Sequence, residues 1–105
     1  MEEICSFFIN DKIYIIYDVD KIEGKKSYVG QSQYDKGLVF IEKGTKENML
    51  ITLKHELMHI WLYENGHTNQ DGNEIFNYED VCELAALNND SMNRIVNEYL
   101  KSKQW

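Results

Sequence analysis

Two histidines and a glutamate stand close together in the sequence, His55, Glu56 and His59, in the pattern H-E-x-x-H. Residues four positions apart on an α-helix project from the same face, so both imidazoles can reach one Zn²⁺ ion at about 2.0–2.1 Å. Glu56 then lies beside the metal without binding it, where a general base must be to take a proton from zinc-bound water. The pattern predicts a zinc site that hydrolyses amide bonds.

An ordinary amphipathic helix with two surface histidines and a solvated glutamate would show the same five residues. Two observations favour the metal site instead. The pattern is flanked by apolar residues at helical spacing, Leu53, Leu57 and Ile60, and it contains two of the chain's three histidines.

A catalytic zinc ion needs a third protein ligand and an open fourth position. The next predicted helix offers Glu79, Asp80 and Glu83. Glu79 and Glu83 are four residues apart and share a face, so one can bind the metal while the other orients a histidine through its second ring nitrogen. Spacing alone does not choose between them.

Amide hydrolysis also needs a hydrogen-bond donor for the developing oxyanion, and Tyr63, His67 and Tyr78 carry donors within sequence reach. For both tyrosines, a place at the edge of the core is favoured over this role. His67 lies two positions after the place that a metzincin motif reserves for its third histidine, which argues against it as a ligand.

Three stretches of the chain, Thr52–His59, Tyr63–Gly66 and Tyr78–Ala86, together resemble the minimal zincins of phage and mobile elements, the ImmA/IrrE-like metallopeptidases. The resemblance covers about Gly30 to the C-terminus. It implies a zinc-dependent peptidase acting on a protein or peptide substrate, with a repressor-like regulator as one candidate.

In that family the third ligand is a glutamate that opens a Glu-x-x-Cys-Asn-x-x-Ala stretch. The residues Glu79-x-x-Cys82-Glu83-x-x-Ala86 match this stretch except at the asparagine. The resemblance therefore implies Glu79 as the zinc ligand, Glu83 as the substituted neighbour and Cys82 as a core residue.

Composition narrows the class of protein. The 105 residues are 43% apolar and 28% charged and contain no proline, which is typical of one globular domain spanning 1–105. A net charge of −7 argues against direct binding of nucleic acid. The sequence has neither a membrane-spanning stretch nor a basic secretory signal, and two cysteines are too few for a disulfide scaffold. We expect a cytoplasmic protein with reduced thiols.

The elements that must position the site follow from residue patterns. The predicted strands are Ile4–Ile9, Lys12–Val19, Tyr28–Tyr34 and Leu38–Glu42. The predicted helices run from a cap at Thr45 to Gly66, from Tyr78 to Leu87, and from Ser91 to Leu100 with Asp90 or Ser91 as its cap. We expect an α+β fold, in which a small N-terminal antiparallel sheet of three or four strands packs on the motif helix and two further helices.

Edge pairing with Leu38–Glu42 is one way for so small an enzyme to hold an extended substrate. Two other classes of function stay open, a zinc-containing pseudo-enzyme and a small regulatory or interaction protein of a mobile element. The presence of Glu56 and an open ligand position favour the enzyme.

Overall fold

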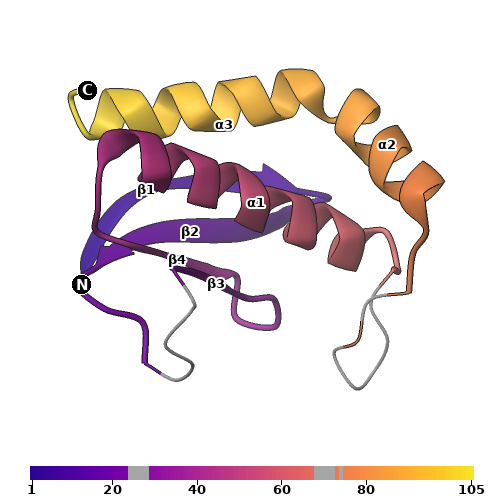
Figure 1. The fold of residues 1–105 in the computed structure, drawn as a ribbon, viewed down its shortest axis with the longest axis horizontal. Coiled ribbons are helices and arrows are strands. Elements are labelled where there is room, and N and C mark those ends of the chain that lie inside the picture. Colours follow the sequence, from indigo (N-terminus) through magenta and orange to yellow (C-terminus); the bar gives the residue numbers. More distant parts are fainter. Residues whose placement is uncertain (24–28, 68–72, 74) are drawn as a thin grey trace.

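A computed structural model of the chain describes residues 1–23, 29–67, 73 and 75–105. A four-stranded sheet from the N-terminal part of the chain packs against three helices, so the fold is α+β, as the sequence predicts (Figure 1). The strands are β1 (Glu2–Ile9), β2 (Lys12–Val19), β3 (Gly30–Gln33) and β4 (Leu38–Glu42). The helices are α1 (Lys46–Glu64), α2 (Tyr78–Leu87) and α3 (Asn89–Ser102), and α3 runs back along α1 in the opposite direction.

Two tight turns build the sheet as two antiparallel hairpins. Asn10 and Asp11 join β1 to β2 with φ angles of 50° and 66°, the left-handed geometry that two-residue hairpin turns need. Gly37 closes the turn between β3 and β4 with φ of 66°. A Cβ atom on Gly37 would lie 2.4 Å from the carbonyl oxygen of Ile13, so this turn requires glycine.

The two hairpins join through a parallel pairing of β2 with β4, which gives the strand order β1-β2-β4-β3. The prediction of an antiparallel sheet is therefore wrong for this one pairing, because turn residues do not specify which strands of two hairpins meet. β4 lies inside the sheet with partners on both sides, so the proposed substrate pairing with Leu38–Glu42 is also wrong. The edge strand beside β4 is β3.

One face of the sheet carries the core. Alternate strand residues point toward the helices and are buried, namely Phe7, Ile9, Tyr14, Ile16, Val39 and Ile41. The predicted apolar stripe of α1 meets them, with Leu53, Leu57 and Ile60 fully buried. Because burying such a side chain stabilises a fold by about 1.5–3 kcal/mol, this contact fixes the position of α1 on the sheet.

The ends of α1 follow the predicted signals, whereas the start of α3 does not. Thr45 caps α1 by accepting a hydrogen bond from the backbone N–H of Asn48 at 3.2 Å, and Gly66 follows its end with φ of 82°. The helix α3 begins at Asn89, directly after Asn88, which also ends α2. The prediction of Asp90 or Ser91 as its cap is wrong, since both lie inside the first turn.

Both cysteines are free thiols in the structure. Cys5 on β1 is half-buried, and burial raises its pKa to about 11, with Glu98 and Asp18 adding to the effect. Cys82 is exposed on α2, so the expectation of a core residue is wrong. The reason is the shallow packing of α2, in which Leu84 alone is buried.

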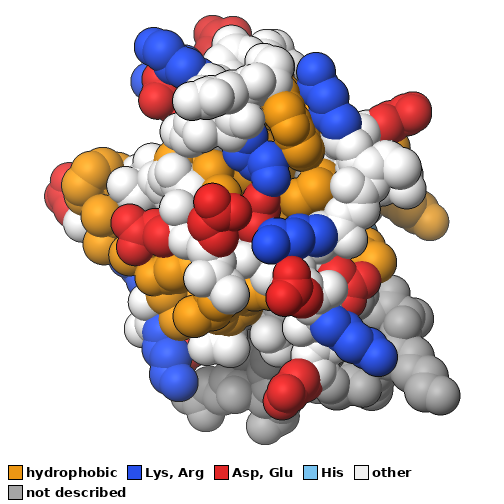
Figure 2. Space-filling view, turned by 90° about the vertical axis from the view of Figure 1, so that its left-hand side faces the viewer, with side chains coloured by type: hydrophobic (Ala, Val, Ile, Leu, Met, Phe, Trp, Pro, Cys, Tyr) orange, Lys and Arg blue, Asp and Glu red, His pale blue; other side chains and the backbone are white. Residues whose placement is uncertain are grey.

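One face of the molecule carries charged side chains of both signs. Figure 2 shows acidic, basic and apolar side chains interspersed over the face of the molecule near the start of the chain. Among the helices of the described residues, none combines the length and apolar character needed to cross a bilayer.

A buried ionic cluster fastens α3 to the sheet. Asp18 on β2 is fully buried, and its carboxylate accepts a hydrogen bond from the Tyr99 hydroxyl at 2.6 Å and another from the Lys103 ammonium. Burial raises the pKa of the Tyr99 hydroxyl, and the hydrogen bond to Asp18 raises it further. Removing such a partner from a buried carboxylate strongly destabilises the folded state.

We predict that Lys103→Ala lowers the free energy of unfolding by about 3–5 kcal/mol, because it leaves the Asp18 charge buried without its cation. The matched control is Lys43→Ala, which removes an exposed pair with Asp20 and costs less than about 1 kcal/mol. Urea unfolding followed by circular dichroism measures both variants. Equal losses in the two variants would contradict the structural role of the cluster.

Candidate metal centre

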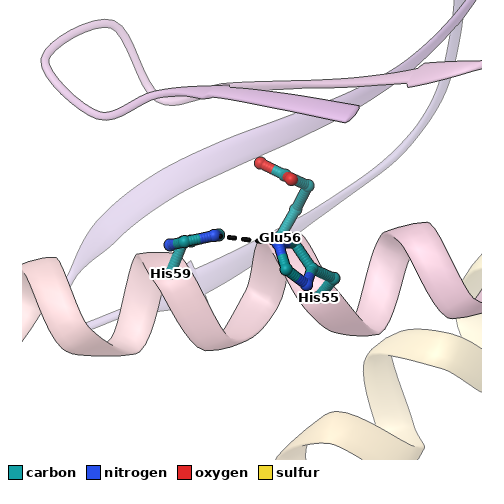
Figure 3. Close-up of side chains that lie close together, drawn as sticks. All are labelled: His55, Glu56 and His59. Atoms are coloured by element: carbon teal, nitrogen blue, oxygen red, sulfur yellow. Dashed lines mark hydrogen bonds between the residues drawn. The ribbon is translucent and has the colours of Figure 1, made fainter. Parts of the chain in front are cut away.

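The H-E-x-x-H residues lie on the middle turns of α1, on the flank of the helix that faces the sheet edge (Figure 3). Glu56 is buried, His59 is intermediate and His55 is exposed. The apolar stripe of α1 packs into the core, which turns the adjacent stripe of His55 and His59 toward the solvent beside β3. The helical period thus places two imidazoles and one carboxylate at the border between core and solvent.

The two imidazoles meet edge-on, with their ring planes 71° apart. Their Nε2 atoms are 3.0 Å apart and share a hydrogen bond, and their ring centroids are 4.6 Å apart (Figure 3). Two nitrogen ligands at about 2.0–2.1 Å from one tetrahedral metal ion would be about 3.3 Å apart. The pair therefore needs little rearrangement to exchange the shared proton for a metal ion.

Glu56 completes the group. One of its carboxylate oxygens lies within 4.8 Å of the ligand nitrogens of both histidines. The side chain is only 7% exposed, and Oε1 accepts a hydrogen bond from the Ser32 hydroxyl of β3 at 2.8 Å. A buried carboxylate needs such a donor, and this contact holds the Glu56 carboxylate between α1 and β3.

Gly30 allows β3 to come this close to the helix. A Cβ atom there would lie 2.6 Å from Cγ2 of Thr52 and 3.0 Å from Oε2 of Glu56. Gly30 and Ser32 are two residues apart and point to the same face of the strand, so the Glu56 carboxylate lies against both.

A pocket of about 500 Å³ opens in front of this group. One wall is β3 with its neighbours Val29 and Tyr34, and the other is the exposed flank of α1 from Ile51 to His59. Since His55, Glu56 and His59 all line the pocket, a molecule bound there would contact all three.

The predicted third ligand lies elsewhere. In the part of the chain that the structure describes, the one group of three or more potential ligands is His55, Glu56 and His59. Glu79 and Glu83 are both exposed on α2 and stand outside it. Asn77 and Asp80 fix the start of α2 by a reciprocal capping box, with both hydrogen bonds at 2.9 Å. Glu79 as a ligand stays a prediction.

The predicted oxyanion donors are also outside the pocket lining. His67 donates through Nδ1 to the carbonyl oxygen of Ile75 at 3.3 Å and lies 3.9 Å from Asp80, so it supports the start of α2. Tyr78 is 90% exposed. Neither is brought to the histidine pair.

Tyr63 supports the end of the pocket. Its ring stacks on that of Tyr34, a lining residue, with centroids 4.4 Å apart and planes 7° from parallel. Lys12 holds this end together, since its ammonium donates to the Tyr34 carbonyl oxygen and to Glu64. Tyr63 therefore occupies the edge of the core, the second of its two expected positions.

Ser32, Gly30 and Tyr34 are neighbours of the candidate site that the sequence patterns did not predict. An isolated glycine within a strand often marks a close approach of the backbone to another group, which was the available signal for Gly30. No local pattern pairs Ser32 with Glu56, because the two residues are 24 positions apart.

Comparison with protein-family models, with curated proteins and with solved structures finds no match for this chain. The resemblance to ImmA/IrrE-like metallopeptidases therefore stays a prediction from the residues that carry it.

We predict that Gly30→Ala lowers the free energy of unfolding by about 1–3 kcal/mol, because the added methyl group collides with Thr52 and Glu56. Gly44→Ala is the matched control, since a Cβ atom there has no neighbour within 4 Å. Urea unfolding of both variants measures the difference. A Gly30→Ala protein as stable as Gly44→Ala would show that β3 does not pack tightly on α1.

Proposed function

We propose that this protein is a zinc-dependent metallopeptidase that hydrolyses peptide bonds in a protein substrate. The observation that carries the proposal is the group of two imidazole nitrogens 3.0 Å apart with a carboxylate beside them, at a pocket. The types of these side chains fit a zinc site, because neutral imidazoles are preferred zinc ligands and a nearby carboxylate is the usual base.

His55 and His59 would hold the zinc ion. When bound, zinc supplies a Lewis acid that polarises the substrate carbonyl and makes a water molecule more acidic. The exposed edge of His55 and the adjoining pocket leave room for substrate on the solvent side of the pair.

Glu56 acts as the general base and then as the general acid. Its carboxylate accepts a proton from the water that attacks the scissile carbonyl carbon, and it delivers that proton to the leaving nitrogen as the C–N bond breaks. The hydrogen bond from Ser32 holds this largely buried carboxylate next to the histidines. The group can therefore act in both steps without moving far.

We propose Glu79 as the third ligand, on the strength of the family resemblance. Glu79 lies in the first turn of α2. This helix packs shallowly on the rest of the fold, because Leu84 is its one buried residue. A movement of α2 that brings Glu79 to the histidines therefore disturbs little of the buried core.

The substrate is an extended segment of a protein, and a repressor-like regulator is the candidate that the resemblance suggests. β3 is an edge strand of the sheet and forms one wall of the pocket. An extended peptide can pair with such an edge and so present its backbone to the site. Two free thiols are consistent with the cytoplasm as the place of action.

We predict that Glu56→Gln retains one zinc ion per chain and lowers kcat/KM about 10²–10⁴-fold, because the base is lost and the ligands remain. His55→Ala should lose the zinc, whereas His67→Ala should keep it, since His67 lies outside the group. Elemental analysis after gel filtration measures the metal, and cleavage of dye-labelled casein measures activity. A zinc-loaded but inactive wild-type protein would indicate a pseudo-enzyme.

A second experiment distinguishes the two glutamates of α2. We expect Glu79→Gln to lower zinc affinity by more than about 100-fold, the upper limit for a residue that only orients a ligand, and Glu83→Gln to lower it about tenfold or less. Competition with a chromogenic chelator measures both affinities. The reverse order would make Glu83 the ligand.

A further inference from the structure

We propose that Ser32 is the positioning residue of the catalytic base, and that its hydrogen bond to Oε1 fixes the carboxylate of Glu56 in the orientation that accepts the proton. The inference rests on the proposed function. It assigns a role to a residue of the edge strand that no motif in the sequence marks.

The contact is specific in distance and direction. The Ser32 hydroxyl lies 2.8 Å from Oε1 of Glu56. Ser32 pairs in the sheet with Val39, whose side chain is fully buried, so Ser32 points toward the helix side of the sheet. The hydroxyl therefore reaches the carboxylate of a residue that is 7% exposed.

Gly30 limits the position of the second oxygen. Oε2 lies 3.0 Å from the place that a Cβ atom on Gly30 would occupy, so the backbone of β3 stands directly beside it. One oxygen of Glu56 is held by Ser32 and the other lies against Gly30. Together these two contacts define the plane of the carboxylate.

A glutamate needs such support because the terminal torsion of its side chain is broad and roughly two-fold, so the carboxylate otherwise turns freely. A base that rotates away from the attacking water loses rate, since a misplacement of about 1 Å costs on the order of 100-fold. Serine suits the task because its hydroxyl donates a hydrogen bond without bringing a positive charge, and the carboxylate keeps its charge for the proton.

The kinetic test compares Ser32→Ala with Ser32→Thr in the zinc-loaded protein. We expect Ser32→Ala to lower kcat about 10–100-fold, with KM changed less than about twofold and one zinc ion retained. Ser32→Thr should restore kcat because threonine keeps the hydroxyl. Gln33→Ala is the control on the same strand, because Gln33 pairs with Leu38 on the opposite face of the sheet.

A second readout does not depend on activity. In the metal-free protein, thermal unfolding of Ser32→Ala, Glu56→Ala and the double variant forms a double-mutant cycle. If Ser32 holds Glu56, the double variant melts at nearly the same temperature as Glu56→Ala alone.

Three results would overturn the proposal: an unchanged kcat in Ser32→Ala, a failure of Ser32→Thr to restore it, or strictly additive losses of melting temperature. The proposed function fails differently, by an inactive zinc-loaded wild type or by full activity in Glu56→Gln. A wild type that needs Glu56 but not Ser32 would reject this inference and leave the peptidase intact.

Discussion

A carboxylate at the rim of a hydrophobic core has to find a hydrogen-bond donor inside the protein, and Glu56 imposes this requirement on the whole site. The donor is Ser32, so β3 must lie close above α1, and the lack of a side chain at Gly30 makes that distance possible. The spacing between β3 and α1 then sets the width of the pocket in front of the histidines. The buried stripe of α1 fixes the rotation of the helix about its axis, because Leu53 and Leu57 on the adjoining face are fully buried in the core.

Features that depend on a few consecutive residues could be predicted from the sequence. The buried stripe of α1, its cap at Thr45 and the turn at Asn10 and Asp11 all follow from local residue preferences. The pairing of β2 with β4 and the exposure of Cys82 could not be predicted, because both depend on how distant elements meet.

The candidate site also has a part that depends on neighbouring residues and a part that depends on how distant elements meet. His55, Glu56 and His59 lie within two turns of one helix, so the helical period alone brings them together. A third ligand from α2 depends on how that helix docks, and α2 buries only Leu84 among its described residues. Ser32 comes from β3, which reaches Glu56 only through the order of strands in the sheet.

The second buried carboxylate, Asp18, affects when the chain can fold during its synthesis. Asp18 and Lys103 are 85 positions apart, so β2 is synthesised long before the cation that neutralises it. At the usual rate of synthesis, about 5–20 residues per second, the delay is about 4–17 seconds. During that interval the core-facing side of β2 carries an uncompensated charge, which opposes stable burial of the sheet. Cooperative closure of the core must therefore wait for α3 to emerge.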